Sequence, residues 1–428
     1  MRKFYFAFVT IALFVIASCS QNDELPIDSG ASTRTIKYDN SIVHVSINSI
    51  VGPTVSLSAF FKQEGVTINK RGFVWSMKNN KPTIGGKSIF RLIDFTGKDT
   101  ITNTLNTTYV DTYYYVRGYA ITSTADTIYS DIDSFMISSI KPQIETMPIT
   151  NRTRIAAITI GRFISYGNVT INGFGICMNS KGYPTMNDQY IAAVDTASDT
   201  NYKGQFGAFF DNLAANTMYH VRAYCIYTVN SHRDTIYAND RIFKTTFGGD
   251  VQWTWGDNDK GKSSDATVNA RIAQAMDSAM YYYNNYSNLY HRITANYNPG
   301  VPTADCTLSG WMRFGPGETY QWVGTAQHEI SHAMGVGTAW NWSSFGDPWS
   351  KPIATQSIRV LLKDMTQNIH GAYNNQIHFW PGGINYRNEV ENPGTSNTKG
   401  VVFSGVYMLK VNAMMCNALR EDGLASYY

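Results

Sequence analysis

The stretch "TYYYVRGYAITSTADTIYS" at residues 112–130 recurs in altered form as "TMYHVRAYCIYTVNSHRDTIYA" at 217–238. Upstream of each copy lies a second related pair, "VTINKRGFVWSMKNNKPT" at 66–83 and "VTINGFGICMNSKGYPT" at 169–185. The two copies are offset by about 100 residues, which is the size of a β-sandwich rather than of a solenoid unit. The sequence therefore predicts that the middle of the chain is one all-β module present twice.

Polar and apolar positions alternate within these segments, as in a strand with one buried face. In the first copy the face expected to be buried consists of Tyr114, Val116, Gly118 and Ala120. The paired segments resemble the fibronectin type III-like modules common in Bacteroidetes surface proteins. The resemblance implies two all-β fibronectin III-like sandwiches, at residues 41–140 and 141–246, and modules of this kind usually act as spacers that present another domain.

The composition is that of a folded chain and gives no sign of a nucleic-acid partner. The 428 residues are 43% hydrophobic and 16% charged, and on length alone they suggest about two to four domains. The net charge of +3 is small, and no cluster of Lys or Arg stands out. We therefore expect no nucleic acid among its partners.

The N-terminal "MRKFYFAFVTIALFVIASC" has a basic start followed by an uncharged, mostly apolar run from Phe4 to Ala17. A bilayer span needs about 20 residues, so this run is too short to cross but suits the core of a signal peptide. Its end, "IASC", resembles the bacterial lipoprotein box. The resemblance implies a signal peptide at 1–18, lipidation of Cys19 and a tether at 19–40. It also implies an outward-facing protein, anchored by lipid to the outer membrane or cell surface.

The other cysteines do not form a disulfide framework, since four are scattered over the remaining 400 or so residues. Cys177 and Cys225 fall on strands that would be neighbours in the second module, so a bond between them is one alternative. The other, which we favour, is that both are buried thiols.

A change of composition after residue 246 marks a C-terminal domain at 247–428. Apolar residues then recur at helical spacing in "ATVNARIAQAMDSAMYYYNNYSNLY", which predicts a helix capped by Ser264 or Asp265. The segment "GWMRFG" at 310–315 alternates as a short edge strand would. A second helix is expected from about Thr325 to the "GVG" turn.

The second helix carries the zinc-binding pattern His-Glu-x-x-His in "TAQHEISHAMGVG". Positions i and i+4 share one helix face, so His328 and His332 are predicted to hold one zinc ion. Glu329 would act as general base on a water molecule. A helix, an edge strand and a His-Glu-x-x-His helix is the element order of the zincin metallopeptidases. The resemblance implies an α+β zincin-like domain that hydrolyses peptide bonds of extracellular proteins or peptides, glycoproteins among them.

The third zinc ligand is not given by the motif. Metzincins continue the pattern to a further His, but Thr338 occupies that position here, and a neutral hydroxyl is a poor ligand. His370, His378 and Glu389 are the downstream alternatives. The segment "HFWPGGINY" resembles a pattern found in a group of secreted bacterial zincin-like proteins. That resemblance favours His378.

The sequence leaves two other roles open, the residue that stabilises an oxyanion and the methionine beneath the metal. Tyr386 or Arg387 is placed by position to stabilise an oxyanion. Metzincins also have a Met in a turn beneath the metal, and three methionines near the C-terminus are candidates by position. Their segment has the spacing of an amphipathic helix, so we expect them to pack in the core. The three are Met408, Met414 and Met415.

Two rival functions compete with the peptidase. One is a surface lipoprotein that binds glycan or protein and carries a non-catalytic zinc site. The other is a zinc hydrolase that cuts a different bond, such as a cell-wall amide. The presence of Glu329 argues against the first rival, because a structural metal site needs no general base.

Overall fold

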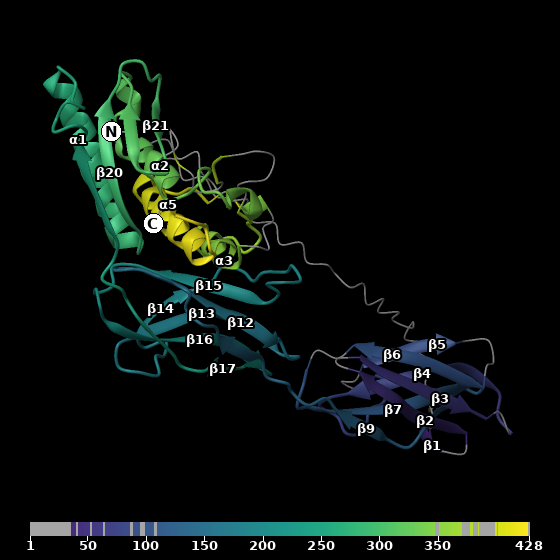
Figure 1. Ribbon diagram of the computed structural model, residues 1–428. Helices are drawn as coiled ribbons and strands as arrows, with labels where there is room; N and C mark the ends of the chain where they lie inside the picture. The colour runs from purple at the N-terminus through teal and green to yellow at the C-terminus, as the bar shows by residue number, and fades with distance from the viewer. Residues whose placement is uncertain are drawn as a thin grey trace, which may run out of the picture. The chain divides into compact units, whose positions relative to one another are not determined.

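The computed structural model describes most of the chain and divides it into two compact units (Figure 1). The first unit comprises Met1–Asn48, Ser56–Thr104 and Tyr114–Ser134, and the second comprises Ser49–Val55, Leu105–Tyr113 and Phe135–Tyr428. The described residues are 36–39, 42–51, 54–62, 65–85, 89–94, 99–106, 109–346, 351–369, 377–379, 384, 399 and 401–426. The described part is rich in β-sheet, and its α-helices all follow residue 265.

The first copy of the repeat forms two sheets. One has the strand order β1-β8-β7-β4-β5, with β9 also paired to β7, and the other has the order β2-β3-β6. The strands are β1 (Ile36–Tyr38), β2 (Val43–Val51), β3 (Thr54–Phe61), β4 (Ile68–Ser76), β5 (Ile89–Asp94), β6 (Thr100–Asn106), β7 (Tyr113–Thr122), β8 (Thr127–Tyr129) and β9 (Asp133–Met136). On β7 the face predicted from the alternation is buried as expected.

The second copy also forms two sheets, which enclose a common core. The strand orders are β10-β12-β11, with β15 paired to β12, and β14-β13-β16-β17, with β18 paired to β16. Phe206 of the first sheet and Val221 of the second belong to one buried cluster. The strands are β10 (Gln143–Thr146), β11 (Asn151–Arg152), β12 (Ala157–Ser165), β13 (Thr170–Asn179), β14 (Gln189–Ala192), β15 (Gln205–Phe210), β16 (Met218–Val229), β17 (His232–Tyr237) and β18 (Arg241–Lys244).

Cys177 and Cys225 are both buried free thiols, as expected. They lie on the neighbouring strands β13 and β16 but belong to different clusters. Cys225 packs in the core between the sheets, whereas Cys177 packs with Tyr224 on the opposite face. Side chains on opposite faces of one sheet point apart, so this pair cannot be bridged.

The second β module shares a hydrophobic core with the C-terminal helices. Strand β12 is buried on both faces: Ala157 packs inside the module, whereas Ile158 and Ile160 pack in the cluster that contains Ile358 and Met414. Figure 1 shows β15 of the module running beneath helix α3 (Pro352–Leu361). A free spacer would not bury such a surface, so this module differs from that expectation.

Buried polar groups join the same two regions. The Asn151 amide donates to the hydroxyl of Ser357 over 2.8 Å and in turn accepts from Asn417 over 2.9 Å. The Arg359 guanidinium, 1% exposed, pairs with Asp199 at 2.8 Å. Because buried polar groups need partners, these contacts fix one orientation of the module against the helices.

The C-terminal region is built on a four-stranded sheet of order β19-β20-β22-β21. The strands β19 (Asp250–Trp255), β20 (Tyr290–Tyr297) and β22 (Trp311–Phe314) are parallel, and β21 (Ala304–Cys306) is antiparallel to β22. The predicted edge strand at 310–315 is therefore wrong. That segment is β22, which lies inside the sheet, and the edge in the described part of the chain is β21.

The helices cover one buried cluster beside this sheet. Helix α1 (Ala266–Tyr286) is capped by the Asp265 carboxylate, one of the two predicted caps. The three C-terminal methionines are buried within helix α5 (Gly405–Glu421), so their expected core packing is confirmed. The other helical segments are η1 (Glu318–Tyr320), α2 (Val323–Ala333), η2 (Trp342–Gly346), α3 (Pro352–Leu361) and α5 (Gly405–Glu421). In the described residues, none of the helices has the length and apolar character to cross a membrane.

Candidate metal centre

Helix α2 carries the site, with His328 and Glu329 on one turn and His332 on the next. It begins at Val323, close to the predicted start, and its last residue is Ala333. Gly335 follows with φ of +105°, a conformation that L side chains rarely adopt. A methyl group there would lie 2.4 Å from the Ala425 carbonyl oxygen, so glycine is needed to end the helix against the C-terminal segment.

His328, His332 and His378 come together, and this group could hold a metal ion. One ring nitrogen from each lies within 4.8 Å of the other two. Small side-chain rotations would reduce this to the roughly 3.4 Å expected between ligands of a tetrahedral ion with ~2.1 Å bonds. The two helical histidines are buried and His378 is exposed, so the group is open to solvent on one side.

Backbone carbonyls orient the two buried imidazoles. His328 Nδ1 lies 2.8 Å from the Ile384 carbonyl oxygen, and His332 Nδ1 lies 2.7 Å from that of Val336. A carbonyl can only accept, so each Nδ1 carries the proton and donates it. The Nε2 lone pair of each ring is then free to bind metal, which is the arrangement usual for metal-ligating histidines.

The histidines are held neutral, as metal ligands must be. Burial, with a further contribution from the imidazoles of His332 and His378, lowers the pKa of His328 to about 3. Burial also lowers the pKa of His332 and of His378. A neutral donor set of three imidazoles fits zinc and other borderline divalent ions.

Glu329 is a buried carboxyl group beside these ligands, 5% exposed. Burial, and secondarily the Asp305 carboxylate, raises its pKa to about 8. Asp305 lies on β21 and forms a two-point ion pair with Arg313 of β22, with Nε 2.9 Å from Oδ1. Acidic groups with pKa values shifted towards neutrality are typical of sites of proton transfer.

Two residues in the turn after α2 support the site without binding the metal. The Thr338 hydroxyl donates to the carbonyl oxygen of His332, so Thr338 stabilises the helix end. Gly337, with φ of +72°, packs so closely that a methyl group there would lie 2.1 Å from the carbonyl oxygen of Ile377, the residue before His378. The sequence predicts Gly337 only as a helix stop. The signal for its further role is its fixed spacing from the metal motif.

The structure thus brings together the three predicted ligands His328, His332 and His378, and the predicted base Glu329 directly follows the first of them on α2. The alternatives His370 and Glu389 and the oxyanion candidates Tyr386 and Arg387 lie outside the described residues, as does the predicted lipidation site. We therefore leave those predictions open. No model of a known protein family matches the chain, and no curated protein sequence matches it.

Proposed function

We propose that this chain is a surface-anchored, zinc-dependent endopeptidase that hydrolyses peptide bonds of extracellular proteins. The observation that carries the proposal is the group of three histidines, two of them on one helix and oriented by carbonyls, with a buried carboxyl group next to the first. This is the donor set of a catalytic zinc site, which has three protein ligands and an open fourth position.

His328, His332 and His378 would hold the ion. When bound at such a site, zinc polarises a carbonyl group and lowers the pKa of water towards ~7. Zinc is favoured over other metals by the all-imidazole ligand set combined with a neighbouring glutamate.

Glu329 is proposed as general base. It accepts a proton from water and passes it to the leaving amine. Its pKa of about 8 in the absence of metal would keep it protonated at neutral pH, whereas a nearby cation favours the carboxylate form. Metal binding would therefore favour the ionised form of this base.

The open edge of β21 supports a peptide as substrate. Thr307 N donates to Trp311 O and Gly315 N to Thr303 O, so the odd-numbered residues of β21 face β22. The backbone groups of Ala304 and Cys306 consequently face away from the sheet, where an extended peptide could pair with them. An antiparallel edge strand beside the metal helix supports a zincin-like fold, and the paired sheets of the two repeats support fibronectin III-like modules.

The deciding experiment uses a positionally scanned peptide library and the full chain. We expect cleavage that is lost with a chelator and restored by zinc. Glu329→Gln should abolish cleavage while zinc content stays near one per chain, because this residue acts on water rather than on metal. Zinc bound at that stoichiometry without any cleavage by the wild type would instead favour a glycan- or protein-binding lipoprotein with a non-catalytic site. Loss of zinc in Glu329→Gln would make its role structural.

A further inference from the structure

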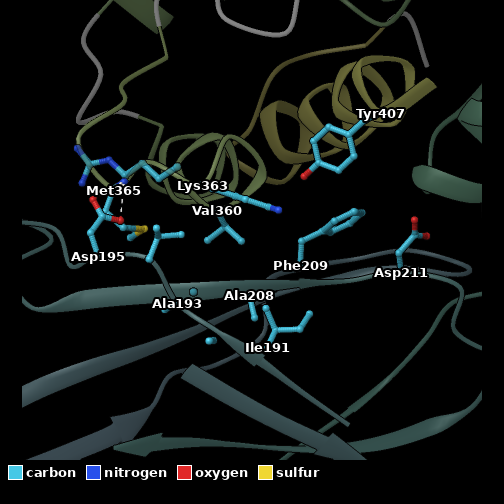
Figure 2. A pocket seen from close by; sticks show the side chains of 14 residues that line it. Ile191, Ala193, Asp195, Ala208, Phe209, Asp211, Val360, Lys363, Met365 and Tyr407 are labelled. Atoms are coloured by element: carbon cyan, nitrogen blue, oxygen red, sulfur yellow. Dashed lines mark hydrogen bonds between the residues drawn. The ribbon is translucent and has the colours of Figure 1, made fainter. Parts of the chain in front are cut away.

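A cleft of about 490 Å³ lies between the second β module and the C-terminal helices, formed by residues other than the metal centre's (Figure 2). One wall comes from the end of β14 and from β15, and the other from α3, the turn after it and α5. Apolar side chains line much of the cleft, among them Ile191, Ala193 and Val360. A pocket of this size at a junction of two regions is a typical place for a ligand.

Strand β15 presents unpaired backbone groups to this cleft. Phe163 N donates to Gly204 O, and β12 pairs with β15 in register from that point. Hydrogen-bonded pairs alternate in an antiparallel ladder, so Phe206 and Ala208 face β12 while Gly207 and Phe209 face outward. Within the described part of the chain, the outward N–H and C=O groups of Gly207 and Phe209 have no hydrogen-bond partner. Both residues line the cleft.

Two aromatic rings flank this edge. Phe209 of β15 and Tyr407 of α5 lie with ring centroids 6.1 Å apart at an interplanar angle of 79°. Both are only partly buried, and the Tyr407 hydroxyl donates to the Leu361 carbonyl oxygen over 2.6 Å, which fixes its ring. A pair of rings beside a strand edge, one of them held by a hydrogen bond, offers a place for an apolar side chain.

One cationic side chain that lines the cleft has no acidic partner among the described residues. The two acidic lining residues, Asp195 and Asp211, pair with Lys399 and Lys410. Arg359, also in the lining, pairs with Asp199. Lys363 is exposed and forms no ion pair with any described residue. Figure 2 shows its side chain extending past Val360 towards the space between Phe209 and Tyr407.

We propose that this cleft binds an extended peptide segment that adds to β15 as a further strand and places an acidic side chain against Lys363. Backbone groups of Gly207 and Phe209 supply the main-chain hydrogen bonds, and the aromatic pair receives an apolar side chain of the peptide. Binding requires neither metal nor hydrolysis, so the inference goes beyond the proposed peptidase activity. In a peptidase the cleft serves as a second contact for a protein substrate.

The probe is a fluorescein-labelled heptapeptide amide, Thr-Val-Thr-Glu-Thr-Val-Thr, whose Glu and Val side chains share one face of a strand. Anisotropy is measured with the full chain carrying Glu329→Gln, in the presence of a chelator, so that cleavage cannot interfere. Lys363→Glu is the test variant, and Lys244→Glu is the matched control, because Lys244 is an exposed lysine of β18 that does not line the cleft.

We expect saturable binding that Lys363→Glu weakens roughly five- to tenfold, as for reversal of one exposed charge contact. Lys244→Glu should leave it unchanged. A peptide with Lys in place of Glu should show the reverse preference, binding Lys363→Glu better than the parent chain. A fall in affinity shared equally by both variants and both peptides would overturn the assignment of Lys363.

N-methylation tests the strand pairing, because it removes amide donors from one edge of the peptide. Methyl groups on alternate residues along one backbone edge should abolish binding, and methyl groups along the other edge should leave it intact. Equal binding of the two methylated peptides, or no binding of the parent peptide, would overturn the proposal. Neither outcome depends on whether the chain hydrolyses peptides, so the two proposals fail independently.

Discussion

The imidazole of His378 decides whether the two histidines of α2 form a tight metal site. With His328 and His332 alone, a metal would keep at least two open positions and bind loosely. We predict that His378→Ala lowers zinc affinity by more than about 100-fold, beyond what loss of an orienting contact costs, and removes activity. Zinc content of the purified chain measures this.

The control for that prediction is His220→Ala, because His220 bonds to Asp240 on the second module and has no part in the site. His370→Ala and Glu389→Gln should likewise leave zinc near the wild-type level. Wild-type zinc content in His378→Ala would refute the assignment, and zinc loss in Glu389→Gln would move the protein to another branch of the zincins.

The buried cysteines should be unreactive in the folded chain. Burial raises the pKa of Cys177, Cys225 and Cys416 to about 12, and that of Cys306 is raised further by burial and the nearby Glu329. At pH 8 only about one such thiol in ten thousand is ionised, and the thiolate is the reactive form. We therefore expect iodoacetamide to modify none of the four at pH 8 unless denaturant is added, as judged by mass spectrometry. Rapid labelling of Cys306 in the native chain would contradict its burial.

Sequence spacing identifies the site residues on α2 but not the third ligand. His328, Glu329 and His332 follow from helical geometry, because four residues return the chain to the same face. His378 lies 46 residues after His332 (378 minus 332), and no local periodicity brings it back. The prediction of His378 as a ligand rests on the resemblance of the segment "HFWPGGINY" to a pattern in secreted zincin-like proteins. The carbonyl groups of Val336 and Ile384 that orient the rings leave no trace in residue identity, because every residue has a carbonyl.

The turn after α2 should be needed to position the third ligand, His378. Gly337→Ala introduces a methyl group 2.1 Å from the carbonyl oxygen of Ile377, which must move and take His378 with it. We predict roughly tenfold or greater loss of zinc affinity, comparable to loss of a contact that orients a ligand. Isothermal titration of the metal-free chain with zinc measures it.

Gly423→Ala is the matched control for Gly337→Ala. Gly423 also has positive φ, +98°, but a methyl group there meets nothing within 4 Å. Both variants should lose about 1 kcal/mol of stability from the strained backbone, and only Gly337→Ala should lose zinc affinity. Equal zinc affinities for the two variants would show that the contact with Ile377 does not position His378.

Local signals predicted single elements better than their places in the sheet. The Asp265 cap and the helical spacing of α1 are short-range features, and both predictions are confirmed. The strand at 310–315 was found, but alternation reports only that one face is buried. Whether a strand lies inside a sheet depends on its neighbours, and the true edge, β21, has three residues, too few for a pattern.

The second β module and the C-terminal region share one hydrophobic core. The alternation of polar and apolar residues in the repeats does not predict this feature of the whole molecule. The signal was present in "IAAITIG" at 155–161, an unbroken run of residues without charge. In β12 this run is buried on both faces, which is typical of strands covered on two sides. The features that the two copies share do not indicate a surface that only one of them uses.

This shared core predicts that the metal-binding region cannot be isolated at residue 247. In a fragment of residues 247–428, the faces of α3 and α5 that bury Ile358, Val360 and Met414 would lose the cover of Ile158 and Ile160. Each exposed aliphatic side chain costs about 1.5–3 kcal/mol, so exposing these three would cost roughly 4.5–9 kcal/mol, a large part of the roughly 5–15 kcal/mol that stabilises a typical domain. We expect residues 141–428 to hold zinc and to unfold in one calorimetric transition. The shorter fragment should aggregate or unfold many degrees lower. A fragment of residues 247–428 that melts within a few degrees of 141–428 and binds zinc equally well would show that the contact is not part of the fold.

Asn151→Ala tests the same contact by a point substitution in residues 141–428, without shortening the chain. It leaves the buried Asn417 amide without its acceptor and should lower that single transition by about 1–3 kcal/mol, whereas Asn187→Ala, at an exposed position of the same module, should not.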